Sequence, residues 1–130
     1  MRNKGLIAVI DDDPGVLDSL QGLLESVGYS AAVFSSAEAF LESGCAAESR
    51  CVIVDIGLPG MNGLALRRHL RVEHADLPVI LISAQQDSAL LQEIDTRDCL
   101  RFFEKPFDTP RLISAVATLA RSMDKPGAEI

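Results

Sequence analysis

The amino-acid sequence predicts an α/β protein: a doubly wound (βα)5 three-layer sandwich around a parallel five-stranded sheet in the order 2-1-3-4-5. Apolar runs of strand length alternate along the chain with segments in which apolar residues recur at helical spacing, which is typical of βαβ units. The strongest apolar runs are continuous, as expected of strands covered by helices on both faces. The 130 residues suffice for one core. We expect one domain at 1–122, followed by a tail or the start of a linker at 123–130.

The first half of the chain supplies three of the predicted strands and two of the helices. LIAVI at 6–10 is a continuous apolar run, and the weaker run SAAVF at 30–34 suits an edge strand. Between them, Asp13 is expected to cap a helix that has Pro14 at its first position and that ends at Gly28. The next predicted segments are a capping box at 35–38 that opens a helix to Ser43, a polar loop at 44–50 and the strand CVIVD at 51–55.

The second half continues this alternation. A glycine- and proline-rich loop, GLPGMNG at 57–63, precedes a helix whose apolar positions are Leu64, Leu66, Leu70 and Val72. The remaining predicted elements are a strand at 78–83, a short helix around 90–94, a strand at 100–103 and a last helix that opens at residues 108–110.

Composition and charge narrow the range of functions. The net charge of −7 and the pI near 4.7 disfavour direct binding to nucleic acid or to an anionic membrane. The basic residues Arg67, Arg68, His69 and Arg71 share one helical segment and are expected to form a solvated face. The three cysteines lack the spacing of a disulfide framework or a zinc site, and Cys51 is expected to be buried. Without a membrane-length apolar run or an evident signal peptide, we expect a cytoplasmic protein.

Polar residues follow four of the five predicted strands. They are Asp11 and Asp12 after the first strand, Asp55 after the third, Ser83 after the fourth and Lys105 shortly after the fifth. In an open parallel sheet these positions share the carboxyl edge, and the first and third strands flank the topological switch point. We therefore expect the three carboxylates to converge on one site.

This set of groups predicts phosphoryl chemistry supported by a divalent cation. Carboxylates without nitrogen or sulfur ligands suit Mg2+. At about 4–5 Å, each pair of carboxylates repels by about 3–4 kcal/mol at an effective dielectric constant near 20, and a cation would relieve that repulsion. A lysine and a serine opposite them would hold the oxygens of a phosphoryl group, and an aspartate can act as the nucleophile. Because the sequence has no P-loop motif, a P-loop nucleotide is not the expected donor.

Four motifs together resemble the receiver domain of two-component response regulators, of the nitrogen-regulatory and nitrogen-fixation type. The motifs are VIDDD, VDIGLPGMNG, LISA and FFEKPF, and the similarity covers about residues 5–122. Asp55 and Ser83 are 28 residues apart, and Ser83 and Lys105 are 22 apart, which matches that type of receiver without a gap. The resemblance implies that Asp55 takes a phosphoryl group from a phosphohistidine on a sensor histidine kinase or a phosphotransfer protein.

The resemblance also implies a metal site and two tuning positions. Asp12 and Asp55 would bind Mg2+ (or Mn2+) directly, with the Gly57 carbonyl as a third ligand and Asp11 acting through water. Gly57 and Gln85 occupy positions that tune dephosphorylation in the family.

The remaining implied roles concern phosphoryl binding and switching. Ser83 would hydrogen-bond the phosphoryl oxygens, Lys105 would pair with the phosphate, and the bond before Pro106 would be cis. Ser83 and Phe102 would form the switch, although Phe102 lacks the hydroxyl of the tyrosine found in some receivers. A second departure is Asp98-Cys99, where the family often has Gly-Ala.

The implied output is a change of shape on phosphorylation, in the face formed by the fourth helix, the fifth strand and the fifth helix. That face would bind a downstream protein or an attached output domain, and a homodimer through it stays open. Neither nucleic acid nor a membrane is expected to bind the domain directly. Such a domain would catalyse its own phosphorylation and dephosphorylation without turning over an external substrate.

Two other functions stay open. One is a receiver-like binding module that is never phosphorylated. The other is a metal-dependent phosphatase of the haloacid-dehalogenase type, with Asp11 as nucleophile and Asp13 completing its D-x-D start. That phosphatase would need a substrate cap and a further acidic pair after Lys105, where the sequence shows only scattered acids.

Overall fold

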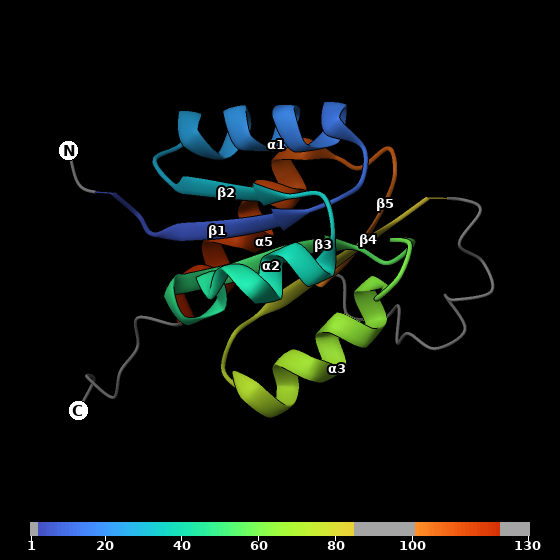
Figure 1. The fold of residues 1–130 in the computed structure, drawn as a ribbon. Helices are drawn as coiled ribbons and strands as arrows, with labels where there is room; N and C mark the ends of the chain where they lie inside the picture. Colours follow the sequence, from blue (N-terminus) through green and yellow to red (C-terminus); the bar gives the residue numbers. More distant parts are fainter. Residues whose placement is uncertain (1–2, 85–100, 123–130) are drawn as a thin grey trace, which may run out of the picture.

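The sheet of the computed structural model, which describes residues 3–84 and 101–122, confirms the predicted topology. Its five strands run parallel in the order β2-β1-β3-β4-β5, with β2 at an edge (Figure 1). The strands are β1 (Leu6–Ile10), β2 (Ser30–Phe34), β3 (Ser49–Asp55), β4 (Val79–Ser83) and β5 (Phe102–Glu104).

Helices cover both faces of this sheet (Figure 1). Side chains of α1 (Pro14–Ser26) and α5 (Thr109–Ser122) pack on one face, and those of α2 (Ala37–Ser43) and α3 (Gly63–Glu73) pack on the other. Because consecutive side chains of a strand point to opposite faces, residues 7–10 enter the two cores alternately and all are fully buried. This arrangement explains why the first strand is a continuous apolar run.

Both ends of α1 are as predicted. Asp13 is the N-cap, and its carboxylate accepts a hydrogen bond from the backbone N–H two residues on, at 2.9 Å. At the other end Gly28 N donates to Glu25 O at 3.1 Å and Tyr29 N donates to Leu24 O at 3.0 Å, the paired bonds of a Schellman motif. That motif needs a left-handed residue, and Gly28 has a φ of 103°.

The capping box predicted at the start of α2 is wrong. Ser36, not Ser35, caps the helix, and its Oγ accepts a hydrogen bond from Ala39 N at 3.0 Å. The Glu38 carboxylate does not turn back to the cap. It accepts a hydrogen bond from Met61 N at 2.9 Å, in the loop that follows β3.

The boundaries of β3 and β5 also differ from prediction. Residues 44–50 do not form an open polar loop, because they contain a 3-10 helix, Cys45–Glu48, and the start of β3. Ser49, the first residue of β3, is buried, and its Oγ is satisfied because it donates to Cys45 O at 2.8 Å. β5 lies later than the predicted 100–103, with its last residue, Glu104, in register with Ser83. The helix predicted around 90–94 and the tail at 123–130 lie outside the described residues.

The predicted solvated face of α3 is confirmed for Arg68, His69 and Arg71, which are exposed, but is wrong for Arg67. The Nε of Arg67 is buried and has no hydrogen-bond partner among the described residues. Burial, and after it the charges of neighbouring arginines, lower the pKa of this guanidinium. Val72, expected on the apolar side of the helix, is 80% exposed. None of the helices described in the structure is long and apolar enough to cross a membrane.

Candidate functional site at the carboxyl edge of the sheet

Three neighbouring strands deliver polar side chains to one edge of the sheet. Asp11 directly follows β1, Asp55 is the last residue of β3, and Ser83 is the last residue of β4. All three are buried, which is uncommon for polar residues and marks the site as part of the interior. The convergence that the sequence predicts is therefore confirmed.

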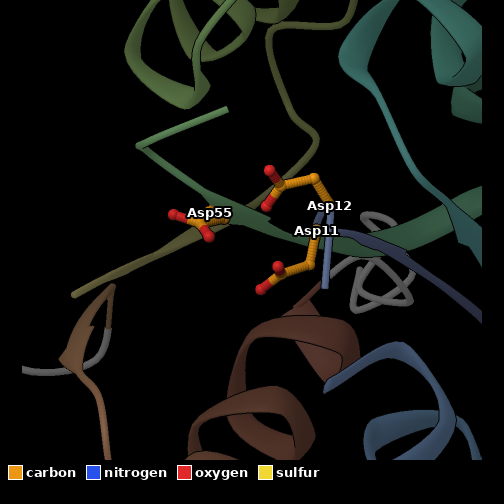
Figure 2. Close-up of side chains that lie close together, drawn as sticks. All are labelled: Asp11, Asp12 and Asp55. Carbon is orange, nitrogen blue, oxygen red and sulfur yellow. The ribbon is translucent and has the colours of Figure 1, made fainter. Parts of the chain in front are cut away.

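The three aspartates lie together, as Figure 2 shows. Asp11, Asp12 and Asp55 each offer a carboxylate oxygen, and these oxygens lie within 4.8 Å of one another. The two adjacent aspartates differ in environment, since Asp11 is fully buried and Asp12 is exposed. Asp13 contributes no side chain to the group, but its N–H donates to Asp11 Oδ1 at 2.9 Å. The run of three aspartates thus divides into two site residues and a helix cap.

Lys105 supplies the only positive charge that the described residues bring into contact with these carboxylates. Its Nζ lies 3.0 Å from Asp11 Oδ2 and 3.1 Å from Asp55 Oδ2. The contact with Asp55 is an aligned hydrogen bond, while the contact with Asp11 is an ion pair without that alignment. The backbone holds the lysine in place because Lys105 N donates to Ser83 O at 2.8 Å. The peptide bond between Lys105 and Pro106 is cis, as expected.

The pKa directions follow from this arrangement. Burial raises the pKa of the Asp11 carboxyl, the negative charge of Asp55 adds to the rise, and contacts with Asp13 N and Lys105 oppose it. Burial alone would lower the pKa of Lys105, but contacts with Asp11 and Asp55 outweigh it, so this pKa is raised. Lys105 therefore stays cationic at neutral pH, between two carboxylates.

The loop after Asp55 is fixed against the site from several sides. Gly57 N donates to Asp55 Oδ1 at 2.9 Å. Gly63 opens α3 so close behind Asp55 that a Cβ there would lie 2.7 Å from the Asp55 carbonyl oxygen. Glu38 holds the far side of the loop through Met61 N. Sequence reasoning missed Glu38 because a glutamate in the first turn of a short helix matches a capping box equally well.

The structure shows fewer contacts for the remaining predicted site residues. The Ser83 Oγ is buried and has no hydrogen-bond partner among the described residues. Phe102 is half-buried and packs against the same core as α2 and α3. Gln85, a predicted tuning position, lies outside the described residues.

The donor set suits a hard divalent cation next to a phosphoryl group. The oxygens are carboxylates in a cluster whose like charges Lys105 only partly neutralises, and Mg2+ prefers such ligands. An unpartnered buried hydroxyl is costly, and the Ser83 Oγ would gain a partner if an anion were bound beside Asp55. The residues present therefore fit a divalent cation and a phosphoryl group.

Comparison with known proteins agrees with this chemistry. The family model described as response regulator receiver domain matches residues 7–117. The transcriptional regulatory protein FixJ of Bradyrhizobium diazoefficiens is 32% identical over 124 residues, which is 95% of this chain and 60% of the relative. The response regulator protein TodT of Pseudomonas putida is 34% identical over 111 residues, 85% of this chain and 49% of the relative. The chain thus spans about half to three-fifths of the length of these relatives.

Solved structures show the same similarity. Full-length FixJ from B. japonicum superposes with a TM-score of 0.81 at 32% identity, covering 98% of this chain and 63% of that one. The receiver domain of NtrX from Brucella abortus superposes with a TM-score of 0.76 at 30% identity, covering 88% of this chain and 98% of that one.

Proposed function

The chain belongs to the receiver domains of two-component response regulators, and from that premise we propose that Asp55 is its phosphoacceptor in a phosphorelay. The observation that carries the assignment is the position of Lys105 Nζ, which contacts the carboxylates of both Asp55 and Asp11. Asp55 is also the aspartate on the side of Ser83, because Asp55 ends β3 and Ser83 ends the neighbouring strand β4.

The proposed reaction is a direct phosphoryl transfer. A carboxylate oxygen of Asp55 forms a bond to phosphorus while the bond between phosphorus and the donor's histidine nitrogen breaks, and that nitrogen keeps the electron pair. Because the phosphorylated ring of the donor carries a proton on its other nitrogen, the products are an acyl phosphate on Asp55 and a neutral imidazole on the kinase or phosphotransfer protein. No general base is needed because the nucleophile is already an anion. Lys105 then pairs with the new phosphate, and Ser83 Oγ donates to one of its oxygens.

The metal site is proposed from the same residues. Asp12 and Asp55 would hold Mg2+ (or Mn2+) directly, with the Gly57 carbonyl, and Asp11 would act through water. A bound cation would neutralise charge that develops on the phosphoryl oxygens. The chain's own contribution is to hold one oxygen of each of these carboxylates within 4.8 Å of the others at the carboxyl edge of the sheet.

The proposed output is a switch that couples Ser83 to Phe102. Ser83 moves towards the phosphate, Phe102 takes the space, and the face that includes β5 and α5 changes shape for a downstream protein or an attached output domain. The relatives are longer than this chain, which supports an attached domain. Gly57 and Gln85 would tune dephosphorylation, and the domain would act in the cytoplasm. A homodimer through the same face stays open.

Intact-mass spectrometry tests the proposal. Incubation with acetyl phosphate and Mg2+ is expected to add one phosphoryl group to the wild type and none to Asp55→Asn. A metal-free incubation with a chelator is the control for the cation. If the wild type gains no mass with acetyl phosphate or with a cognate kinase, the unphosphorylated binding module is favoured. Turnover of a phosphate ester that survives in Asp55→Asn and is lost in Asp11→Asn would instead support a phosphatase.

A further inference from the structure

The loop that connects β3 to α3, residues 56–62, carries the Gly57 carbonyl that we propose as a metal ligand. The two ends of this loop are tied together, because Gly63 N donates to Ile56 O at 3.3 Å. At its exit Asn62 caps α3 with its side chain. The residues between these points decide where the Gly57 carbonyl lies.

The middle of the loop combines a stiff pair of residues with two glycines. Leu58 is buried and precedes Pro59, whose ring fixes its own φ and restricts the backbone of the residue before it. Gly57 and Gly60 flank this pair and are exposed. Gly60 has a φ of 72°, in the left-handed region. Because the pair between the glycines is stiff, a contact just after Gly60 restricts the backbone as far back as Gly57.

Glu38 supplies such a contact from another helix. Its Oε2 accepts a hydrogen bond from Met61 N at 2.9 Å, from a position 23 residues earlier in the chain. The same oxygen lies against Gly60, where a Cβ would be only 2.7 Å from it. The carboxylate thus occupies space that is open because residue 60 is a glycine. The hydrogen bond from Met61 N lowers the pKa of Glu38, so the acceptor is a carboxylate at neutral pH.

The core holds α2 in position for this contact. Ala37 and Phe40, on either side of Glu38, are fully buried in the same core as Leu58. Ser36 caps the helix and fixes its first turn through a hydrogen bond to its Oγ. The exposed carboxylate is therefore carried by a well-anchored helix.

We propose that Glu38 is a positioning residue for the divalent cation, and that it acts through the loop that presents the Gly57 carbonyl. This inference rests on the metal site proposed with the phosphoacceptor role of Asp55. The hydrogen bond to Met61 N keeps the loop in the conformation in which Gly57 N donates to Asp55 Oδ1 at 2.9 Å. Without that bond the loop samples other conformations, and the affinity for the cation falls with the fraction of time spent in the competent one. The loop needs the acceptor oxygen of Glu38, not its charge.

Four variants separate the acceptor from the charge. Glu38→Ala removes both. Glu38→Gln keeps an acceptor oxygen at the same reach without the charge, whereas Glu38→Asp keeps the charge on a side chain one methylene shorter. Glu42→Ala removes an exposed glutamate one turn further along α2 and is the matched control. Circular dichroism of each variant first establishes that it is folded.

Amide hydrogen exchange of Met61, measured by NMR on the metal-free protein, reports the hydrogen bond itself. We expect exchange at least about threefold faster than in the wild type for Glu38→Ala and Glu38→Asp. Glu38→Gln and Glu42→Ala should stay within about twofold of the wild type.

Isothermal titration calorimetry with MgCl2 measures the consequence for the cation. The Kd for Mg2+ should rise about fivefold in Glu38→Ala and Glu38→Asp, which corresponds to a loop that is competent about a fifth of the time. In Glu38→Gln and Glu42→Ala it should stay within about twofold of the wild type. In the acetyl phosphate reaction, the Mg2+ concentration that gives half the maximal rate should shift by the same factor, while the rate at saturating Mg2+ stays within about twofold.

Each of three results would overturn this inference alone. An unchanged Kd for Mg2+ in Glu38→Ala would show that the contact does not serve the cation. Unchanged exchange of Met61 in that variant would show that the hydrogen bond does not hold the loop. Equal weakening of Mg2+ binding in Glu38→Gln or in Glu42→Ala would reduce the effect to charge. A wild type that binds no Mg2+ would refute the proposed metal site, and this inference with it.

Discussion

Replacing Asp12 by asparagine should stabilise the metal-free protein. The oxygens of Asp11, Asp12 and Asp55 lie within 4.8 Å of one another. At an effective dielectric constant of about 20, that distance corresponds to a repulsion of at least about 3.5 kcal/mol for each pair. Asp12 takes part in two such pairs, while Lys105 contacts only the other two aspartates. Because Asp12 is exposed, solvent screens most of this repulsion, and we expect a net gain of about 1 kcal/mol in Asp12→Asn.

When Mg2+ is added, the wild type should instead become more stable than Asp12→Asn. A ligand present at about 100 times its Kd stabilises the folded protein by about 2.7 kcal/mol. The wild type should gain this increment, and Asp12→Asn should lose most of it because a proposed direct ligand is gone. Urea denaturation followed by circular dichroism, with and without Mg2+, measures both free energies of unfolding.

The matched control is Asp18→Asn, which removes an exposed aspartate on α1. It should leave both free energies within about 0.5 kcal/mol of the wild type. A metal-free Asp12→Asn variant that is less stable than the wild type would refute the repulsion argument. An undiminished Mg2+ increment in that variant would remove Asp12 from the metal site.

Three further predictions address the loop and the core. Gly63→Ala should lower the free energy of unfolding by about 1–3 kcal/mol in urea, since its Cβ would lie 2.7 Å from the Asp55 carbonyl oxygen; a neutral effect would contradict that close packing. The hydrogen bond from Met61 N lowers the pKa of Glu38, so the stability it contributes is present above pH 4.5 and is lost below it. Glu38→Gln should therefore differ from the wild type above that pH and approach it below, and a difference that grows in acid would disprove the assignment. Burial raises the pKa of Cys51 to about 12, so iodoacetamide at pH 8 should label it in urea but not in the native protein, as peptide mass spectrometry would show.

The fold could be predicted from the sequence because each strand signal has a local physical cause. Residues 6–10 are continuously apolar because helices cover both faces of the strand. Asp13 suits the start of α1 because its carboxylate accepts a backbone hydrogen bond there, and Gly28 suits the end because it adopts a positive φ. The predictions failed where a side chain forms a hydrogen bond with a backbone group outside its own helix or strand. Glu38 is bound to Met61 N, 23 residues away, and Ser49 enters β3 because Cys45 O accepts its hydroxyl.

The sequence was enough to predict which residues form the candidate site, but not how the surroundings of those residues differ. The carboxyl ends of parallel strands must meet at one edge, which identifies Asp11, Asp55 and Ser83 without coordinates. Adjacency in sequence cannot show that Asp11 is buried against Lys105 while Asp12 faces solvent. That difference depends on where each side chain points after the strand ends.

Locating the acyl phosphate tests whether Asp55 is the phosphoacceptor. The protein would be incubated with Mg2+ and acetyl phosphate, reduced with borohydride, digested and analysed by tandem mass spectrometry, which detects the reduced aspartate as homoserine. We predict homoserine at Asp55 alone, and none without Mg2+. Homoserine at Asp11 or Asp12, with Asp55 unmodified, would contradict it.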